Sequence, residues 1–189
     1  MTTRRPLRAD AVRNRARILG AAHEQITARG PEVSMEQIAA ASGVAVGTLY
    51  KHFPNKTDLV AAVVAASFET VADDAEECLR RSDAGSPAMT EFVAFLTRLM
   101  DTTASNHAVK AAAHELNADH SAHPAMRSVE TRVTAALSRL IATAQTQGEL
   151  RGDFGIDDLY LMLSTLPADQ PPAARTRWLA LLLTGLTAR

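Results

Sequence analysis

The segment from Ser34 to Lys56, SMEQIAAASGVAVGTLYKHFPNK, contains many side chains that are suited to contact duplex DNA. Thr48 offers a hydroxyl and a methyl group, which suit a base edge and the methyl group of thymine. Gly47 lets a backbone come close, because glycine has no Cβ atom. The other polar tips and positive charges can bond phosphates. We therefore expect a DNA-contacting set made of Gly47, Thr48, Tyr50, Lys51, His52 and Lys56.

Two short helices must position these side chains. Ser34 and Gln37 form the pattern of a capping box at a helix start, and Gly43 is a suitable terminator. A second short helix is expected from about residue 45 to 52, because Pro54 disfavours helical geometry in the residue before it. The pair fits a helix-turn-helix pattern, although many helical hairpins with a glycine turn bind nothing.

Composition favours an all-helical protein. The chain has 189 residues, of which 36 are alanine, the best helix former, and only 4% are aromatic. No window shows the sustained alternation of a strand. Hydrophobic periodicity and breaker residues predict nine helices, over residues 10–29, 34–43, 45–52, 55–81, 88–103, 106–117, 124–147, 156–166 and 172–187.

Charge is distributed unevenly along the chain. Residues 1–56 hold nine Lys or Arg and four acids, a net charge of +5, whereas the remaining residues carry −6. A basic N-terminal part followed by an acidic remainder is expected of a nucleic-acid-binding module joined to a second part with another function. A solvated basic helix face explains the same charge equally well.

The run GVAVGTLYKHFPNKTDLV resembles the DNA-binding signature of the TetR/AcrR family of bacterial transcriptional regulators. The resemblance implies a nine-helix fold, with a helix-turn-helix domain at 1–54 and a ligand-binding and dimerisation domain at 55–189. It also implies a homodimer that binds a palindromic operator in double-stranded DNA and releases it when a small molecule binds. The six residues of the DNA-contacting set match the family's DNA-facing positions. Ala45 departs from the serine common there, so a helix cap is expected to be missing. The stretch LIATAQTQGELRGDFGIDDL resembles the C-terminal domain of one subgroup.

Apolar residues in the second half suggest a ligand cavity and a subunit interface. Methionine and phenylalanine side chains suit an adaptable apolar pocket, although their helical spacing fits a hydrophobic core as well. We expect a mainly apolar, neutral or cationic effector of unknown identity, because an anion would meet a negative field. The expected ligand contacts are Phe92, Phe95, Leu96, Leu99, Met100 and Met126. The expected interface, a four-helix contact between two copies, holds Leu159, Met162, Leu163, Leu166, Trp178, Leu179 and Leu182.

Motifs for enzyme chemistry are missing from the sequence. It has no nucleophile elbow, phosphate loop, HExxH or CxxC, so we expect neither catalysis nor a cofactor. His114, His120 and His123 lie near two acids, but their spacing fits no zinc pattern, and we expect no metal. A metal-dependent hydrolase is the alternative from another class, and a constitutive DNA-binding regulator without a ligand is the nearer one. A single cysteine, Cys78, and the lack of a long apolar run predict a cytoplasmic protein without a membrane segment.

Overall fold

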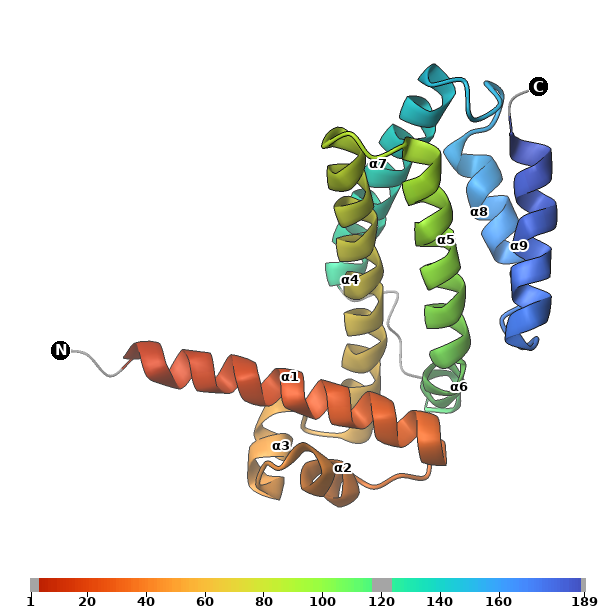
Figure 1. Ribbon diagram of the computed structural model, residues 1–189. Coiled ribbons are helices and arrows are strands. Elements are labelled where there is room, and N and C mark those ends of the chain that lie inside the picture. Colours follow the sequence, from red (N-terminus) through yellow and green to blue (C-terminus); the bar gives the residue numbers. More distant parts are fainter. Residues whose placement is uncertain (1–3, 117–123, 188–189) are drawn as a thin grey trace. The chain divides into compact units, whose positions relative to one another are not determined.

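The computed structural model describes residues 4–116 and 124–187, and its regular structure is helical, as the composition predicts (Figure 1). A single bridge between Leu150 and Thr187 is the β-type pairing within these residues. None of the described helices is long and apolar enough to cross a membrane. The helices are α1 (Arg4–Arg29), α2 (Met35–Ser42), α3 (Val46–His52), α4 (Lys56–Asp83), α5 (Ala88–Ser105), α6 (His107–Glu115), α7 (Pro124–Thr146), α8 (Ile156–Ser164) and α9 (Pro172–Leu186).

The helix starts follow from local capping chemistry. The Ser34 hydroxyl accepts a bond of 3.2 Å from the Gln37 backbone, and the Gln37 side chain accepts one of 2.8 Å from the Ser34 backbone. The Asn55 carboxamide oxygen accepts from the Asp58 backbone at 2.8 Å, at the beginning of α4. The capping box and the Asn55 cap are therefore confirmed.

Helix α1 begins at Arg4, six residues before the expected start at Asp10. The sequence from Arg4 to Ala9 lacks an apolar stripe and contains Pro6. In the first turn of a helix, however, the backbone N–H groups have no intrahelical acceptor, so proline is tolerated there.

The described residues form two compact units, residues 4–67 with 106–116, and residues 68–105 with 124–187. The first contains α1, α2, α3, the beginning of α4, and α6. In it, His23 of α1 contacts the buried Asn106 with 2.6 Å between the ring nitrogen Nε2 and the side-chain oxygen Oδ1. The boundary expected at residue 54 separates DNA binding from ligand binding, whereas the two units are separated by their packing. The boundary at residue 54 stays a prediction. Fully buried apolar side chains fill this unit, among them Ile18, Ile26, Ile38, Leu49 and Leu59.

The second unit has its own apolar core between the second half of α4 and helices α5, α7, α8 and α9. The rings of Phe92 and Phe154 meet edge to face, with centroids 6.4 Å apart. Leu137 and Leu140 of α7 are buried in the same cluster.

On the surface of this second unit, Arg132 of α7 joins three carboxylates of α4. Its guanidinium nitrogens lie 2.7 Å from Glu69 and 2.8 Å from Glu76, and it also pairs with Asp73. Hydrogen bonds from Arg132 lower the pKa of Glu76 below its ordinary value. We call these four residues the Arg132 cluster.

Candidate nucleic-acid interface

The turn between α2 and α3 is fixed by backbone geometry at Gly43. This residue has a φ of 64°, in the left-handed region that favours glycine. The Val44 backbone donates a bond of 3.2 Å to the Ala39 carbonyl, and the buried Ser42 hydroxyl donates one of 3.0 Å to the same carbonyl. Ala39 and Leu49, both fully buried, hold the two helices together. The helix-turn-helix predicted from the spacing is therefore present.

Helix α3 presents part of the expected DNA-contacting set to solvent. Gly47, Tyr50 and Lys51 are exposed, whereas Thr48 and His52 are half-buried. Ala45 stands at the N-cap and makes no side-chain cap bond, as its residue type predicts. The short helix therefore depends on the burial of Leu49 for its position.

The Tyr50 hydroxyl donates a hydrogen bond to the Glu36 carboxylate of α2, with 3.1 Å between the oxygens. The bond raises the pKa of Tyr50. The pKa of Glu36 is lowered, mainly by a bond from its own backbone and then by bonds from Ser34 and Tyr50. A phosphate group that approaches Tyr50 must therefore compete with a carboxylate for its single proton.

Lys56 is half-buried at the beginning of α4, and its ammonium group donates to the Pro31 carbonyl. An ammonium group has three donors, so the remaining two can still reach a phosphate. The same contact holds the loop before α2 against the first turn of α4.

Two arginines of α1 lie close to α3, one at the turn before it and one at its end, and neither was expected in the site from the sequence. The Arg17 Nη2 atom donates a bond of 3.1 Å to the Gly43 carbonyl, just before α3. The Arg15 guanidinium carbon lies 5.3 Å from the centroid of the Phe53 ring, just after α3. Both arginines contribute to the net charge of +5 in residues 1–56, but no spacing in the sequence indicates which part of α1 faces α3.

In the second unit, most of the expected ligand contacts form the core. Phe92, Phe95, Leu96 and Met100 are buried, Leu99 is partly buried, and the Met126 side chain lies outside the described residues. A cavity of about 200 Å³ adjoins this core and includes two of them. Its lining is Thr70, Val71, Asp74, Phe95, Arg98, Leu99 and Thr102.

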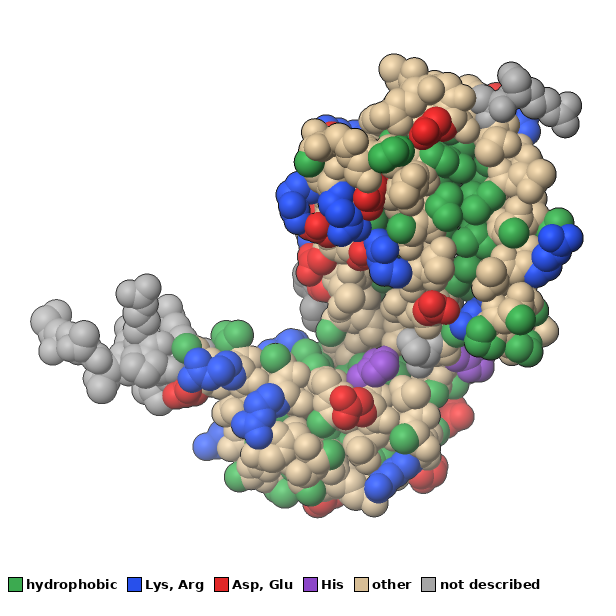
Figure 2. Space-filling model, in the orientation of Figure 1, with side chains coloured by type: hydrophobic (Ala, Val, Ile, Leu, Met, Phe, Trp, Pro, Cys, Tyr) green, Lys and Arg blue, Asp and Glu red, His purple; other side chains and the backbone are tan. Residues whose placement is uncertain are grey.

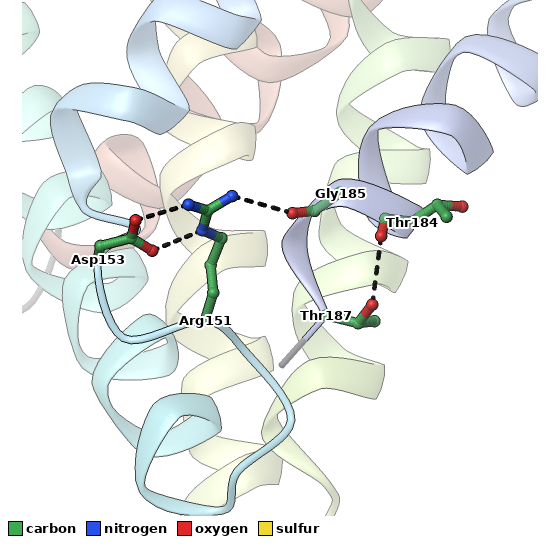
Figure 3. Close-up of a pocket in the computed structure, with 5 residues that line it drawn as sticks. All are labelled: Arg151, Asp153, Thr184, Gly185 and Thr187. Carbon is green, nitrogen blue, oxygen red and sulfur yellow. Dashed lines mark hydrogen bonds and ion pairs between the residues drawn. The ribbon is translucent and has the colours of Figure 1, made fainter. Parts of the chain in front are cut away.

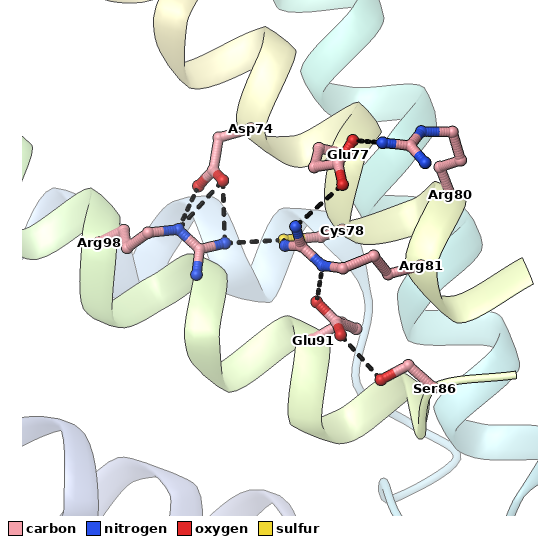
Figure 4. Close-up of polar contacts among 8 residues, drawn as sticks. All are labelled: Asp74, Glu77, Cys78, Arg80, Arg81, Ser86, Glu91 and Arg98. Atoms are coloured by element: carbon pink, nitrogen blue, oxygen red, sulfur yellow. Dashed lines mark hydrogen bonds and ion pairs between the residues drawn. The ribbon is translucent and has the colours of Figure 1, made fainter. Parts of the chain in front are cut away.

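An ion-pair network borders that cavity (Figure 4). Arg98 pairs with Asp74 at 2.9 Å and also donates to the Cys78 sulfur at 2.9 Å. Arg81 bonds Glu91 at 2.8 Å and lies 3.2 Å from the same sulfur. Burial raises the pKa of the Cys78 thiol. The neutral thiol thus packs as a small residue of the core.

A second cavity of about 420 Å³ lies where the end of α9 meets the loop before α8 (Figure 3). The Arg151 guanidinium there binds both oxygens of Asp153, at 2.5 and 2.6 Å, and the Gly185 carbonyl at 3.3 Å. Its charge is therefore paired within the chain.

The expected interface residues fall into two groups. Leu159 and Leu179 are buried in the chain's own core, whereas Met162, Leu163, Leu166, Trp178 and Leu182 are half-buried. Hydrophobic side chains gather over the region of α5, α8 and α9 in Figure 2. The most exposed apolar side chains of α8 and α9 are Leu161 at 69% and Leu181 at 58%, and neither is among the residues expected from the sequence.

Among the described residues no group of three or more His, Cys, Asp and Glu could hold a metal ion. His114 is exposed on α6, and His120 and His123 lie outside the described residues.

Comparisons with known proteins agree with this architecture. Residues 18–63 match the bacterial regulatory proteins of the tetR family, and residues 87–188 match the C-terminal domain of SbtR-like transcriptional regulators. A TetR transcription regulatory protein from Mycobacterium vanbaalenii is 30% identical, with a TM-score of 0.78 over 97% of this chain and 100% of that one. The TetR transcriptional regulator SCO0520 from Streptomyces coelicolor is 27% identical, with a TM-score of 0.74 over 92% of this chain and 98% of that one.

A curated relative, the HTH-type transcriptional regulator SAB2452 of Staphylococcus aureus, is 42% identical over 65 residues. That match covers 34% of this chain and 35% of the relative, so it spans about a third of each. The family matches to both parts of the chain, together with the full-length structural likeness, are more extensive. The chain therefore belongs to the TetR family of DNA-binding transcriptional regulators.

Proposed function

We propose that this protein is a ligand-responsive repressor that binds a palindromic operator as a homodimer and releases it when a small molecule binds. The helix-turn-helix carries this proposal, because α3 exposes Gly47, Tyr50 and Lys51 in the part of the chain, residues 1–56, that carries a net charge of +5. An exposed helix of this kind fits the major groove of B-DNA.

Within this arrangement the residues of the DNA-contacting set read bases, bind phosphates or allow a close approach. Thr48 reads a base edge, and Gly47 allows the backbone of α3 to approach the DNA. Lys51, His52 and Lys56 bind phosphates, which adds affinity without sequence preference. The Tyr50 hydroxyl binds a phosphate only after it leaves Glu36.

The exposed leucines of α8 and α9 support the homodimer. Leu161 and Leu181 are large apolar side chains in contact with water, and half-buried residues such as Trp178 lie on the same two helices. Contact with a second copy would remove this apolar surface from water. Two recognition helices about 34 Å apart would then match successive major grooves of a palindrome.

The effector is expected to be mainly apolar and without negative charge. Most of the surface that the cavity beside Phe95 and Leu99 exposes is apolar, and the arginine in its lining, Arg98, is already paired with Asp74. Such a ligand weakens DNA binding only to the extent that it binds the DNA-free state better, typically by about 1–3 kcal/mol.

Selection of bound duplexes from a random DNA pool tests the proposal. The protein should enrich a palindrome and bind it as two copies. On that site, Thr48→Ala should lose about 1–3 kcal/mol of preference at one base position. Lys56→Ala should weaken selected and scrambled duplexes alike. No enriched sequence, or equal losses on both duplexes for both variants, would contradict the assigned docking.

Sedimentation of the free protein tests the interface. Leu161→Glu should convert the dimer to a monomer, because it places a charge in an apolar contact. Thr176→Glu, which also adds an acid at an exposed position of α9, is the control and should leave the dimer intact. A wild-type protein that sediments as a monomer would refute the homodimer.

A further inference from the structure

We propose that Arg15 and Arg17 of α1 form a phosphate clamp that brackets the recognition helix α3. This inference rests on the proposed DNA binding and adds two residues to it. Both arginines precede residues 18–63, the segment that matches the family's DNA-binding part. The ligand is the DNA backbone, whose phosphates arginine binds in a bidentate manner.

Arg17 lies at the turn that precedes α3. One N–H of its guanidinium bonds the Gly43 carbonyl at 3.1 Å, and the side chain is otherwise exposed. Its position is close to the turn, since a Cβ atom built on Gly43 would lie 2.5 Å from Arg17 Nη2. A guanidinium has five donors, so this bond orients the group and leaves other donors available to a phosphate.

Arg15 marks the end of α3. Its guanidinium carbon lies 5.3 Å from the centroid of the Phe53 ring, and Phe53 itself is buried. An arginine over an aromatic ring keeps its charge and its in-plane donors. The ring therefore holds the side chain in place without occupying its N–H groups.

Both charges are available for an anion. Within the described residues, neither Arg15 nor Arg17 has a carboxylate partner, whereas the neighbouring exposed Arg13 is paired with Asp10. Unpaired guanidinium groups raise the local positive potential, and a pair with an acid cancels most of it.

The spacing suits a docked recognition helix. Helix α3 has seven residues, and at 1.5 Å per residue it is about 10 Å long. The major groove is about 12 Å wide, so a helix of this length has backbone phosphates near both ends. The two arginines of α1 lie beside the turn before α3 and the residue after it, and α1 thereby fixes the orientation of α3 on the duplex.

The test measures binding to a duplex of scrambled sequence as a function of salt. Arg15→Gln and Arg17→Gln remove the charge and keep a polar, neutral side chain at each position. Each variant should lower the steepness of the log–log salt dependence by about 0.9 per lost phosphate contact, or about 1.8 in a two-fold dimer. Arg13→Gln is the control and should leave the slope unchanged, because Arg13 is already paired.

Arg15→Lys and Arg17→Lys complete the design and should retain most of the wild-type slope, because they keep the charge. Thermal unfolding of each variant without DNA accompanies the titrations. The clamp is refuted if both Gln variants bind with the wild-type slope, and the proposed DNA binding then survives. A wild-type protein that binds DNA without any salt dependence would overturn both proposals.

Discussion

Replacing Gly47 by alanine separates the stability of the free protein from its affinity for DNA. Gly47 lies in the first turn of α3 and is exposed, and a Cβ atom built on it meets nothing within 4 Å. Alanine therefore fits without strain, and it restricts the unfolded chain more than glycine does. The free energy of unfolding should rise by about 0.5–1 kcal/mol.

The complex with DNA should respond in the opposite direction. If the backbone of α3 at Gly47 lies against the duplex, the added methyl group occupies the space of the closest approach. A tenfold loss of affinity, about 1.4 kcal/mol, is the expected minimum. Urea unfolding gives the first quantity, and fluorescence anisotropy with a labelled selected operator gives the second.

Gly20→Ala is the matched control for this pair of measurements. Gly20 lies inside α1, is exposed, and likewise has nothing within 4 Å of a built Cβ atom. It should gain about 1 kcal/mol of stability and keep the wild-type affinity. A Gly47→Ala variant that binds DNA as tightly as the wild type would refute the close approach of the α3 backbone to the duplex. A variant that unfolds at a lower free energy than the wild type would refute the conclusion that alanine fits at this position without strain.

Three further substitutions test other parts of the structure. Gly43→Ala should lower the free energy of unfolding, measured in urea, by about 1–2 kcal/mol, because alanine resists the left-handed conformation. Its Cβ atom would also displace the end of the Arg17 side chain. An unchanged free energy of unfolding would contradict this. Glu36→Gln should tighten binding to any duplex, since it removes a negative charge beside α3 and leaves Tyr50 with a weaker, neutral acceptor. Titration against scrambled DNA measures this effect, and weaker binding would count against the geometry. The bond from Arg81 lowers the pKa of Glu91 below 4.5. The ionised Glu91 carboxylate therefore stabilises the fold above pH 4.5, and this stabilisation is lost as the pH falls through the lowered pKa. The stability of Glu91→Gln should fall less steeply with acid in this range, and identical acid-unfolding curves for the variant and the wild type would refute the assignment.

The helices could be predicted from the sequence because their signals are local. A capping box, left-handed glycines and prolines determine where α2, α3 and α9 begin or end, and each acts within a few residues. The beginning of α1 could not be predicted in this way. Its first turn lacks an apolar stripe, and only the permissive geometry of a helix start allows Pro6 there.

The site was predicted less completely, because its contacts join residues far apart in the sequence. Tyr50 and Lys56 have residue types that suit phosphates, but their partners Glu36 and Pro31 become neighbours only through tertiary packing. Arg17 belongs to the site through a bond to a backbone carbonyl 26 residues away. No periodicity in the sequence encodes such a bond.

The same limit applies to the apolar residues of the second unit. Helical spacing identifies the buried face of α8, but it does not show whether the chain's own core or a partner covers it. Leu159 is fully buried, whereas Leu161, two positions further along, is 69% exposed. Only the packing of neighbouring helices separates these two outcomes.

The Arg132 cluster shows which forces align α7 with α4. Its three carboxylates recur at intervals of four and three residues, so each turn of α4 offers Arg132 a similar partner. A slip by one turn, about 5.4 Å, would exchange one carboxylate for the next. The run ends at Arg80, one turn beyond Glu76, where like charges would meet. Ion pairing thus confines α7 to a stretch of α4, and the shapes of buried side chains such as Leu137 must select the register within it.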